Sequence, residues 1–362
     1  MRLPDYSGGG LVNLVAELER RLTGKAASPG LRPDLAAAIP DAATYLLVFC
    51  DGLGDSQLAH PEAASLTASR RGTVDAGFPT TTTVSLATVA TGLPPAGHGL
   101  IAYQLWLPEA GQVANTIKWT TLWGDPLTLD FDAFLPRPNT WERLSAAGRE
   151  PVALQPLSFD GTPLTRALYR GCRREAYADA GEAVAAARQL ARPGGRLVFL
   201  YLPQVDFAAH VGGQGSDMYR QALRLTAGVW EALAASLPPG VVMVGTADHG
   251  HVDIPKDRQV RLARADHEGR TLYGDPRALF VRGEGASLAE RLPAAWVPLA
   301  EMEGWWGPGR PHPRFTERLP DGVLLADPGY ALLHRFSDDR LIGQHGGLTA
   351  EELEVPLLVA GG

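Results

Sequence analysis

Three continuous apolar runs, each followed closely by acidic residues, constrain the fold of this chain more than any other feature. The runs cover residues 44–50, 196–202 and 241–246. Runs of this length without polar alternation are typical of strands that are buried on both faces of a parallel sheet. Segments with helical periodicity lie between them, at residues 180–190 and 218–235. Alternating strands and helices predict an α/β fold, a three-layer sandwich with a largely parallel central sheet.

Metal-type side chains stand close to the ends of these runs. They are Asp51 after the first run, Asp206 and His210 after the second, Asp248 and His249 after the third, and His345 ahead of a last apolar run at residues 355–360. In sheets of this kind, sites lie beyond the carboxyl ends of the strands. Carboxylate oxygens and imidazole nitrogens are ligands that Zn²⁺ takes. Six of them suit two ions with open positions for substrate and water, an arrangement that can promote displacement at phosphorus.

A turn of four consecutive threonines, residues 80–83, leads into the apolar segment 86–91. If a helix starts there, the turn places hydroxyl groups and free backbone N–H groups at the positive end of the helix dipole. Such a turn can bind an anion and supply a nucleophile. Taken alone, it also fits an ordinary threonine N-cap. Its occurrence together with six metal-type ligands favours the chemical interpretation.

Composition argues against a nucleic-acid-coating protein, a membrane protein and a disulfide-based fold. The formal charge of −7 argues against a surface that coats nucleic acid or binds an anionic membrane. There is no apolar run of about 18 residues and no apolar leader near the N-terminus, so we expect no membrane span and a cytoplasmic location. Two cysteines, Cys50 and Cys172, cannot build a disulfide framework.

The chain is expected to form a single catalytic domain over residues 1–362, with two additions. Residues 103–143 hold half of the eight tryptophans in a loop-like and strand-like composition, which predicts an insertion near the site. Residues 255–335 predict a smaller peripheral unit. The oligomeric state, monomer or homodimer, stays open.

Several short motifs occur in one order along residues 45–360. They are Val48-Phe49-Cys50-Asp51-Gly52, Phe78-Pro79-Thr80-Thr81-Thr82 through Thr91-Gly92-Leu93-Pro94, Gly97-His98-Gly99, Tyr201 with Asp206 and His210, Thr246-Ala247-Asp248-His249-Gly250, and His345-Gly346-Gly347. In this combination the chain resembles the alkaline phosphatase superfamily. Within it, the chain is most similar to the branch of type I phosphodiesterases and nucleotide pyrophosphatases with their bacterial relatives.

The resemblance implies two zinc ions, with Mn²⁺ or another divalent metal as alternatives. Asp206, His210 and His345 would hold the ion that activates water, and Asp51, Asp248 and His249 would hold the other together with the nucleophile. The nucleophile position falls on Thr82, with Thr81 as the second candidate. Thr82 would attack phosphorus to give a phosphothreonine-type intermediate that water then releases. Backbone N–H groups near Thr83 would stabilise the developing charge.

Two departures from the branch leave the substrate open. Tyr201 matches an aromatic residue that stacks on a nucleotide base, but Thr83 stands where its aromatic partner is usual. Ser85 replaces an Asn that contacts a phosphoryl oxygen. The tryptophans of the insertion, Trp106, Trp119 and Trp123, are candidates for a replacement apolar wall.

Two further histidines, His98 and His251, lie close to the motifs. They are candidates to orient the ligands, although a structural role is the simpler interpretation.

The expected activity is hydrolysis of phosphate diesters or phosphoanhydrides. A phosphomonoesterase of the same superfamily is the first alternative, but its extra cationic groups are missing because residues 80–100 contain no Arg or Lys. A sulfatase is disfavoured because the turn lacks Cys-x-Pro-x-Arg. A metal-dependent phosphoglycerate mutase would need a longer insertion and usually a serine nucleophile. A non-catalytic relative that only binds metal or phosphoester would be expected to have lost a ligand or the hydroxyl, and the chain retains both.

Overall fold

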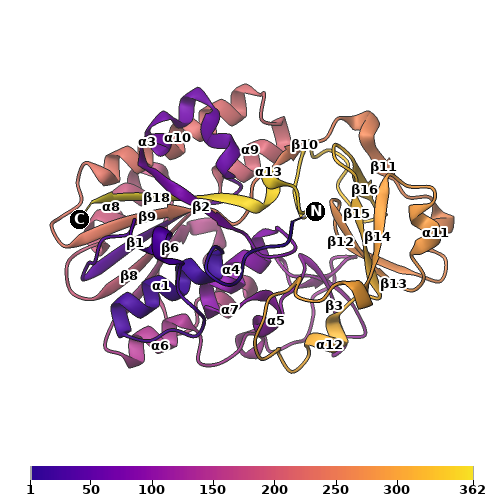
Figure 1. Ribbon diagram of the computed structural model, residues 1–362, viewed down its shortest axis with the longest axis horizontal. Coiled ribbons are helices and arrows are strands. Elements are labelled where there is room, and N and C mark those ends of the chain that lie inside the picture. The colour runs from indigo at the N-terminus through magenta and orange to yellow at the C-terminus, as the bar shows by residue number, and fades with distance from the viewer. Residues whose placement is uncertain (1, 362) are drawn as a thin grey trace.

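The computed structural model describes residues 2–361, except for the side chain at position 132. A seven-stranded sheet runs through the larger part of the molecule (Figure 1). Its strands lie in the order β2 (Arg70–Asp75), β18 (Glu354–Gly361), β9 (Val241–Thr246), β1 (Thr44–Cys50), β8 (Arg196–Leu202), β6 (Glu150–Pro156) and β7 (Arg173–Tyr177). Only β18 runs antiparallel to its neighbours. The prediction of a largely parallel central sheet is confirmed.

The apolar runs form the middle of this sheet. All seven residues of β1 are buried, and the strand pairs in parallel register with β8 on one side and β9 on the other. Because both faces of these strands are covered by helices, apolar side chains are stabilising on both faces and no polar alternation develops.

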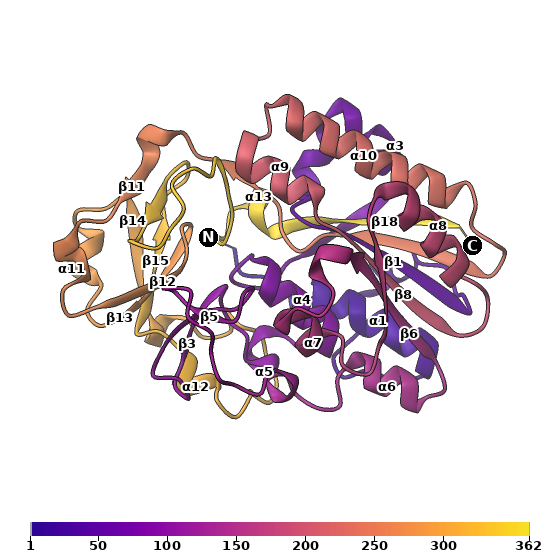
Figure 2. The same cartoon turned by 180° about the vertical axis from the view of Figure 1, so that it is seen from behind.

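Helices cover the two faces of the sheet, as the views from the front and from behind show (Figure 2). One layer contains α3 (Ala64–Ser69), α8 (Ala180–Leu190), α9 (Gln204–Gly212) and α10 (Asp217–Ala234). The other contains α1 (Leu11–Thr23), α4 (Thr82–Thr91), α6 (Thr140–Ala146) and α7 (Pro163–Leu168), with the short α2 (Pro33–Ala36) and α5 (Pro95–His98) nearby in the sequence.

The predicted strands and the helix at residues 180–190 have the expected bounds, whereas one strand of the sheet was not predicted. The helix at residues 180–190 begins after Asp179, whose side chain accepts a hydrogen bond from the Glu182 amide and caps the helix start. Between β1 and β2 the chain forms two 3₁₀ turns followed by α3, with Pro61 at the start of the second turn. Sequence reasoning missed β7, because this edge strand is largely exposed and has no apolar run.

A second, smaller part of the chain lies beside the sheet (Figure 1). It contains an antiparallel sheet of β12 (Thr271–Asp275), β13 (Ala278–Arg282), β15 (Gly322–Ala326) and β14 (Ala294–Pro298), with α11 (Ala286–Ala289) and α12 (Phe315–Arg318). An apolar cluster of its own includes Leu279, Val281 and Leu324. The tryptophan-containing segment forms the three-stranded sheet of β3 (Gln104–Leu107), β4 (Gln112–Asn115) and β5 (Thr120–Thr121).

Short elements complete the fold. Two-stranded pairs join β11 (Gln259–Arg261) with β16 (Ala331–Leu333), and β10 (Val252–Asp253) with β17 (Gly343–Gln344). A last helix is α13 (Ala350–Leu353), and the 3₁₀ helices are η1 (Asp55–Ala59), η2 (Pro61–Ala63), η3 (Phe131–Ala133), η4 (Leu157–Phe159), η5 (Lys256–Arg258), η6 (Arg264–His267) and η7 (Leu299–Glu301).

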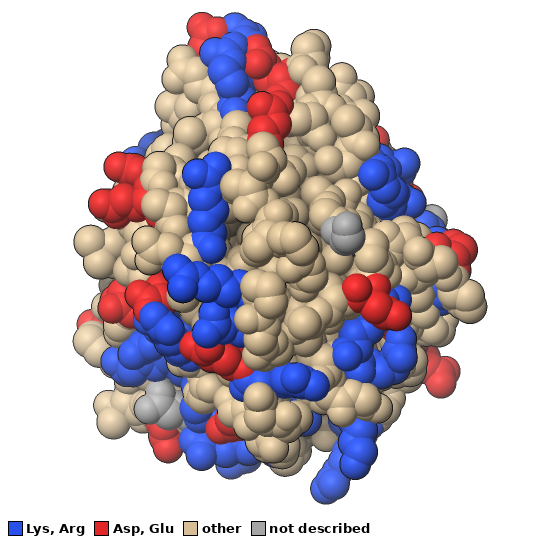
Figure 3. Space-filling model, turned by 90° about the vertical axis from the view of Figure 1, so that its left-hand side faces the viewer, with Lys and Arg blue, Asp and Glu red and all other residues tan. Residues whose placement is uncertain are grey.

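The surface offers little sign of a polyanion-binding face on the side that Figure 3 displays. Basic and acidic side chains lie next to one another there rather than in separate areas of one sign (Figure 3). Among the helices of residues 2–361, none combines the length and the apolar composition that crossing a membrane requires.

Candidate active site

The first part of the site is formed where β1 and β9 end at the same edge of the sheet. Asp51, Asp248 and His249 are buried there, and one potential ligand atom from each lies within 4.8 Å of the others. The His249 Nε2 atom is 3.8 Å from Asp51 Oδ1 and 3.5 Å from Asp248 Oδ2. Asp248 Oδ1 accepts hydrogen bonds from the amides of Gly52 and His249, which fixes the carboxylate.

The second part comes from α9, the helix that follows β8. Asp206 and His210 lie one helical turn apart, so their side chains share a face, and His210 Nε2 is 3.3 Å from Asp206 Oδ1. His251 also reaches this carboxylate, because its Nε2 atom is 2.8 Å from Asp206 Oδ1. Asp206, His210 and His251 thus form a group whose potential ligand atoms lie within 4.8 Å of one another.

His345 joins the cluster through a long-range strand pair. It follows β17, which pairs with β10 just after Asp248 and His249 in the sequence. The rings of His249 and His345 stack with their centroids 3.7 Å apart. Asp206, His249 and His345 form a further group within 4.8 Å. The expected set of Asp206, His210 and His345 is therefore divided between two groups that share Asp206.

Hydrogen bonds on the far side of three imidazole rings fix how the rings face the cluster. The Nδ1 atoms of His210, His249 and His345 lie 2.7, 3.1 and 2.8 Å from the carbonyl oxygens of Gly343, Gly250 and Thr80. A proton on each Nδ1 leaves the Nε2 lone pair free for a metal ion, as is usual for metal-binding histidines.

His251 has the opposite arrangement. Its Nε2 contacts Asp206, and its buried Nδ1 has no partner among the described residues. A carboxylate is an acceptor, so the proton of this neutral ring must be on Nε2. The geometry makes His251 a donor to Asp206 rather than a fourth imidazole ligand. The sequence offered His251 only as one of two nearby histidines, because its distance from Asp206 depends on the fold.

The site gathers three carboxylates without a cationic side chain among the described residues, which suits a bound divalent cation. Burial, together with the nearby Asp248 and Asp206, raises the pKa of Asp51 well above its ordinary value. Asp248 Oδ2 is buried without a partner, and no Lys or Arg of the described chain pairs with these three carboxylates. Burial lowers the pKa of His345 well below its ordinary value, which keeps its ring neutral. Carboxylates and imidazoles gathered with no Lys or Arg beside them form a donor set that suits a divalent cation.

The four threonine hydroxyls have different surroundings. Thr80 Oγ1 donates to the Gly347 carbonyl at 2.9 Å, and Thr81 Oγ1 donates to Asp275 Oδ1 at 3.2 Å. Thr83 Oγ1 accepts from Thr116 at 3.2 Å. These three threonines are buried, whereas Thr82 is partly exposed.

Thr82 is the threonine whose hydroxyl faces the cluster. Its Oγ1 lies 3.4 Å from Asp51 Oδ1 and 3.2 Å from His249 Nε2. Thr82 is the first residue of α4, and the helix supplies two amides, those of Thr82 and Thr83, without a backbone acceptor among the described residues. Thr81 precedes the helix but makes no side-chain cap, so the plain N-cap interpretation does not describe this turn.

The other expected substrate-binding residues lie close to the cluster, but their hydroxyl groups are already hydrogen-bonded within the protein. Ser85 is buried, and its hydroxyl donates to the Asp248 carbonyl at 2.8 Å. The Tyr201 hydroxyl donates to Asp51 Oδ2, and only 6% of this side chain is exposed. Burial and the adjacent Asp51 raise the pKa of Tyr201 well above its ordinary value, so the phenol keeps the proton that it donates. Thr83 offers its backbone amide, since its hydroxyl is engaged with Thr116.

Two cavities meet at Thr82. The first, the apolar cavity, encloses about 520 Å³ and has mostly apolar walls that include Leu86, Ile117, Phe159, Leu164 and Phe207. The second, the polar cavity, encloses about 280 Å³ and is lined by residues that include Tyr103, His210, Asp275, Phe336, Ser337, Asp338 and His345. Thr82, Ile117 and Asp206 line both. The site thus has room for two groups, one on either side of the Thr82 hydroxyl.

The tryptophans of the insertion do not provide the apolar wall that the sequence suggested. Trp119 is buried against Phe131 and Phe134, which stabilises the insertion itself. Trp106 and Trp123 line a different cavity on the far side of Phe336. The sequence could not separate these possibilities, because one aromatic composition serves a small core and a substrate wall equally well. His98 is also buried away from the cluster, with its Nε2 atom 3.2 Å from the Thr88 hydroxyl.

The mostly parallel sheet thus carries an Asp/His cluster at its carboxyl edge. Residues 45–348 match the model of the type I phosphodiesterase / nucleotide pyrophosphatase family. The chain belongs to that family, and the resemblance stated from the motifs is confirmed. Family membership makes the protein a hydrolase of phosphoesters.

Solved structures with the same fold include murine ectonucleotide pyrophosphatase / phosphodiesterase 5, with 21% identity, a TM-score of 0.68 and 88% coverage of each chain. The human protein of the same name has 19% identity and a TM-score of 0.67, with coverage of 88% of this chain and 87% of that one. Phosphonoacetate hydrolase from Sinorhizobium meliloti 1021 has 16% identity and a TM-score of 0.64, with coverage of 89% and 91%.

Proposed function

We propose that this protein hydrolyses phosphate diesters or phosphoanhydrides, with Thr82 as the nucleophile and two divalent cations as cofactors. The observation that carries this proposal is the position of the Thr82 hydroxyl. It is the hydroxyl of the four-threonine turn that faces the Asp/His cluster, at the point where the two cavities meet.

The two cavities support a diester in preference to a monoester. A phosphorus atom beside Thr82 in a diester carries two organic groups, and the cavities on either side of Thr82 can hold one each. A monoester carries one organic group and an additional negative charge. No Lys or Arg of the described chain lines either cavity, so that charge would have no cationic side chain to meet.

The donor set supports two ions. Asp51, Asp248 and His249 would hold one, beside Thr82. Asp206, His210 and His345 would hold the other, since Asp206 already forms a group with each of these two histidines. Mixed carboxylate and imidazole donors suit Zn²⁺, and Mn²⁺ is the alternative. When bound, such ions polarise phosphoryl oxygens and favour the alkoxide form of a nearby alcohol.

The residues of the chain would have distinct roles in the reaction. Thr82 Oγ1 forms the bond to phosphorus, and the leaving alcohol departs toward one of the cavities. The free amides at the start of α4 are placed to stabilise negative charge on a phosphoryl oxygen. Tyr201 holds Asp51 by donating to its second oxygen. Water then releases the phosphoryl group from Thr82, which restores the hydroxyl.

The apolar cavity is suited to a flat or aliphatic group. Ile117, Phe159 and Phe207 lie on its walls and are 46%, 36% and 62% exposed, so they offer uncovered apolar surface at its mouth. An inactive threonine-to-alanine variant of the murine phosphodiesterase 5 has been solved in complex with AMP. A nucleotide diester is therefore the first substrate class to test, with its base in the apolar cavity.

The test compares kcat/KM for bis(4-nitrophenyl) phosphate and 4-nitrophenyl phosphate. The protein is first stripped with a chelator and then refilled with Zn²⁺. The proposal requires a ratio well above one for the diester and no turnover before refilling. A ratio below one would favour the phosphomonoesterase alternative. No turnover of either ester, with zinc bound, would favour a binding protein on the same scaffold.

A further inference from the structure

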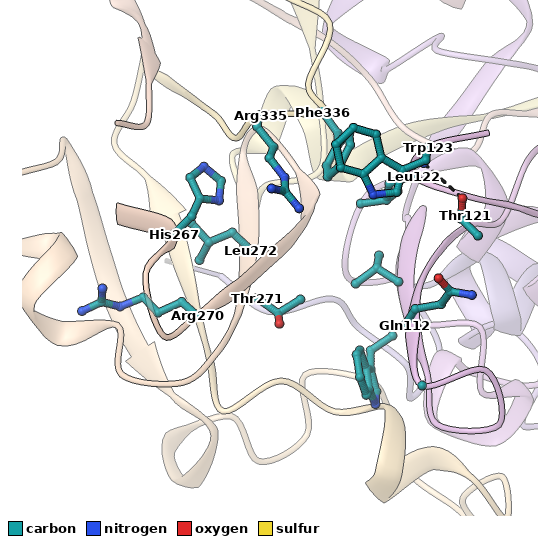
Figure 4. Close-up of a pocket in the computed structure, with 13 residues that line it drawn as sticks. Gln112, Thr121, Leu122, Trp123, His267, Arg270, Thr271, Leu272, Arg335 and Phe336 are labelled. Carbon is teal, nitrogen blue, oxygen red and sulfur yellow. Dashed lines mark hydrogen bonds between the residues drawn. The ribbon is translucent and has the colours of Figure 1, made fainter. Parts of the chain in front are cut away.

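A third cavity lies beyond the polar cavity, between the tryptophan-containing insertion and the antiparallel sheet (Figure 4). It encloses about 280 Å³. One wall carries Gln112, Thr121, Leu122 and Trp123, the opposite wall carries His267, Arg270, Thr271 and Leu272, and Arg335 and Phe336 stand between them. We call it the arginine cavity.

The arginine cavity is cationic in a chain whose formal charge is −7. It contains Arg270 and Arg335 and is lined by no Asp or Glu of the described residues. The Arg270 guanidinium is already engaged, because it pairs with Glu284 at 2.9 Å and donates to Ser287. Arg335 has no ion pair among residues 2–361; its guanidinium carbon lies over the ring of Phe336 at 4.6 Å and over that of Trp123 at 5.3 Å.

Stacking on two rings orients Arg335 without using its N–H groups. A guanidinium over an aromatic face keeps its donors at the rim of the plane, where they can bind both oxygens of a phosphate or carboxylate. Trp123 is 74% exposed, so its ring offers additional surface to a ligand. On the opposite wall stands His267, whose buried Nε2 has no hydrogen-bond partner among the described residues.

Phe336 lies between this cavity and the active site. It lines the arginine cavity on one side and the polar cavity on the other, and the polar cavity reaches Thr82. A group that extends from a phosphorus atom at Thr82 through the polar cavity would have to pass the Phe336 ring to arrive beside Arg335.

We propose that the arginine cavity is a distal subsite for a second anionic group of the substrate. This inference rests on the proposed function, since it places a diester at Thr82. The substrate class is a phosphate diester in which one organic group fills the apolar cavity and the other ends in a phosphate or carboxylate. Arg335 binds that end group, and Trp123 and Phe336 hold the guanidinium in place. No Lys or Arg among the described residues lines the cavities around Thr82, so Arg335 is the cation that acts on the substrate. It recognises the end of the second organic group and not the phosphoryl group that reacts.

The experiment uses two 4-nitrophenyl phosphate diesters whose second alcohol is a short diol chain, ending either in a phosphate or in a free hydroxyl. The wild-type protein is expected to have about tenfold higher kcat/KM for the phosphate-ended diester, the scale of one hydrogen-bonded charge pair. Arg335→Gln is expected to abolish this preference and to leave the hydroxyl-ended diester unchanged. Arg335→Lys should keep part of it.

Arg261→Gln is the matched control. Arg261 is an exposed arginine that pairs with Asp339 at 2.7 Å and does not line the cavity. Its loss removes the same charge from the chain, so the preference should persist. An equal preference in the wild type and Arg335→Gln, or no preference in the wild type, would overturn the subsite.

A binding measurement separates this inference from the proposed function. Phenyl phosphate is titrated calorimetrically into the metal-loaded wild-type and Arg335→Gln proteins. Two binding events in the wild type and one in the variant support an anion site at Arg335, even if neither diester is hydrolysed. Identical titrations overturn the site, even if both diesters are good substrates.

Discussion

Replacing His251 gives the sharpest test of how the metal centre is built. The Nε2 atom of His251 lies 2.8 Å from Asp206 Oδ1, and burial lowers the pKa of the ring to about 4. The ring is therefore neutral at pH 7, with its one proton in the hydrogen bond to Asp206. We expect His251 to hold this carboxylate so that its other oxygen meets the cation.

The expected loss of metal affinity follows from what hydrogen-bond partners of metal ligands contribute in general. Removing a hydrogen-bond partner of a metal ligand typically lowers metal affinity about 10- to 100-fold. This range corresponds to about 1.4 to 2.7 kcal/mol of binding free energy. His251→Phe keeps an aromatic ring and removes the donor, so it should weaken the binding of one of the two ions by this amount. His251→Gln, whose amide can donate from nearly the same place, should recover most of the affinity.

The assay is a competition titration of Zn²⁺ against a chromophoric chelator, with a Co²⁺ absorption spectrum as a second readout. One of two binding constants should fall in His251→Phe, while the other stays within twofold. His60→Gln is the control, because His60 lies outside the cluster and accepts a bond from the Glu62 amide. Equal losses in the Phe and Gln variants would refute the reasoning and assign His251 a packing role.

Three other predictions follow from the contacts described above. Thr82→Ala should lower kcat about 10³-fold or more, while Thr81→Ala should cost about tenfold or less, as steady-state rates with an aryl diester will show. Burial raises the pKa of Asp275 to about 8, so the folded chain retains a proton that the unfolded chain loses above pH 4. Stability should then fall as pH rises from about 4 to about 8, and Asp275→Asn should flatten this fall in urea unfolding of chelator-treated protein. A parallel decline in the variant would contradict the assignment. Arg277 forms a buried pair with Glu352 at 3.2 Å, so Arg277→Gln should lower the free energy of unfolding by about 3–5 kcal/mol; a loss below about 1 kcal/mol would show that the pair is not desolvated.

Phe207 and Ile117 illustrate what the sequence left open about substrate. Both are exposed apolar residues at the apolar cavity, one on α9 and one in the insertion. Neither belongs to a motif, and each taken alone is an ordinary surface hydrophobe. Their importance comes from lining the same cavity, which requires the folded chain.

The sequence by itself determined the sheet and most of the metal-type ligands. Continuous apolar runs predict strands buried on both faces, and parallel strands bring their carboxyl ends to one edge, so Asp51 and Asp248 were expected at the same edge of the sheet. The four-residue spacing of Asp206 and His210 fits one helical turn, and α9 brings both side chains to one face. The motif order then led to the family.

Tertiary structure decided the rest. Which of four adjacent threonines faces the cluster depends on where Asp275, Gly347 and Thr116 lie, since these distant groups engage the other three hydroxyls. The partnership of His251 with Asp206 likewise joins residues 45 positions apart in the sequence. Local sequence fixes periodicity and caps, but a hydrogen bond between distant segments depends on the packing of the whole chain. For that reason membership in a family of phosphoester hydrolases could be predicted from the sequence, and the orientation of the side chains in the site could not.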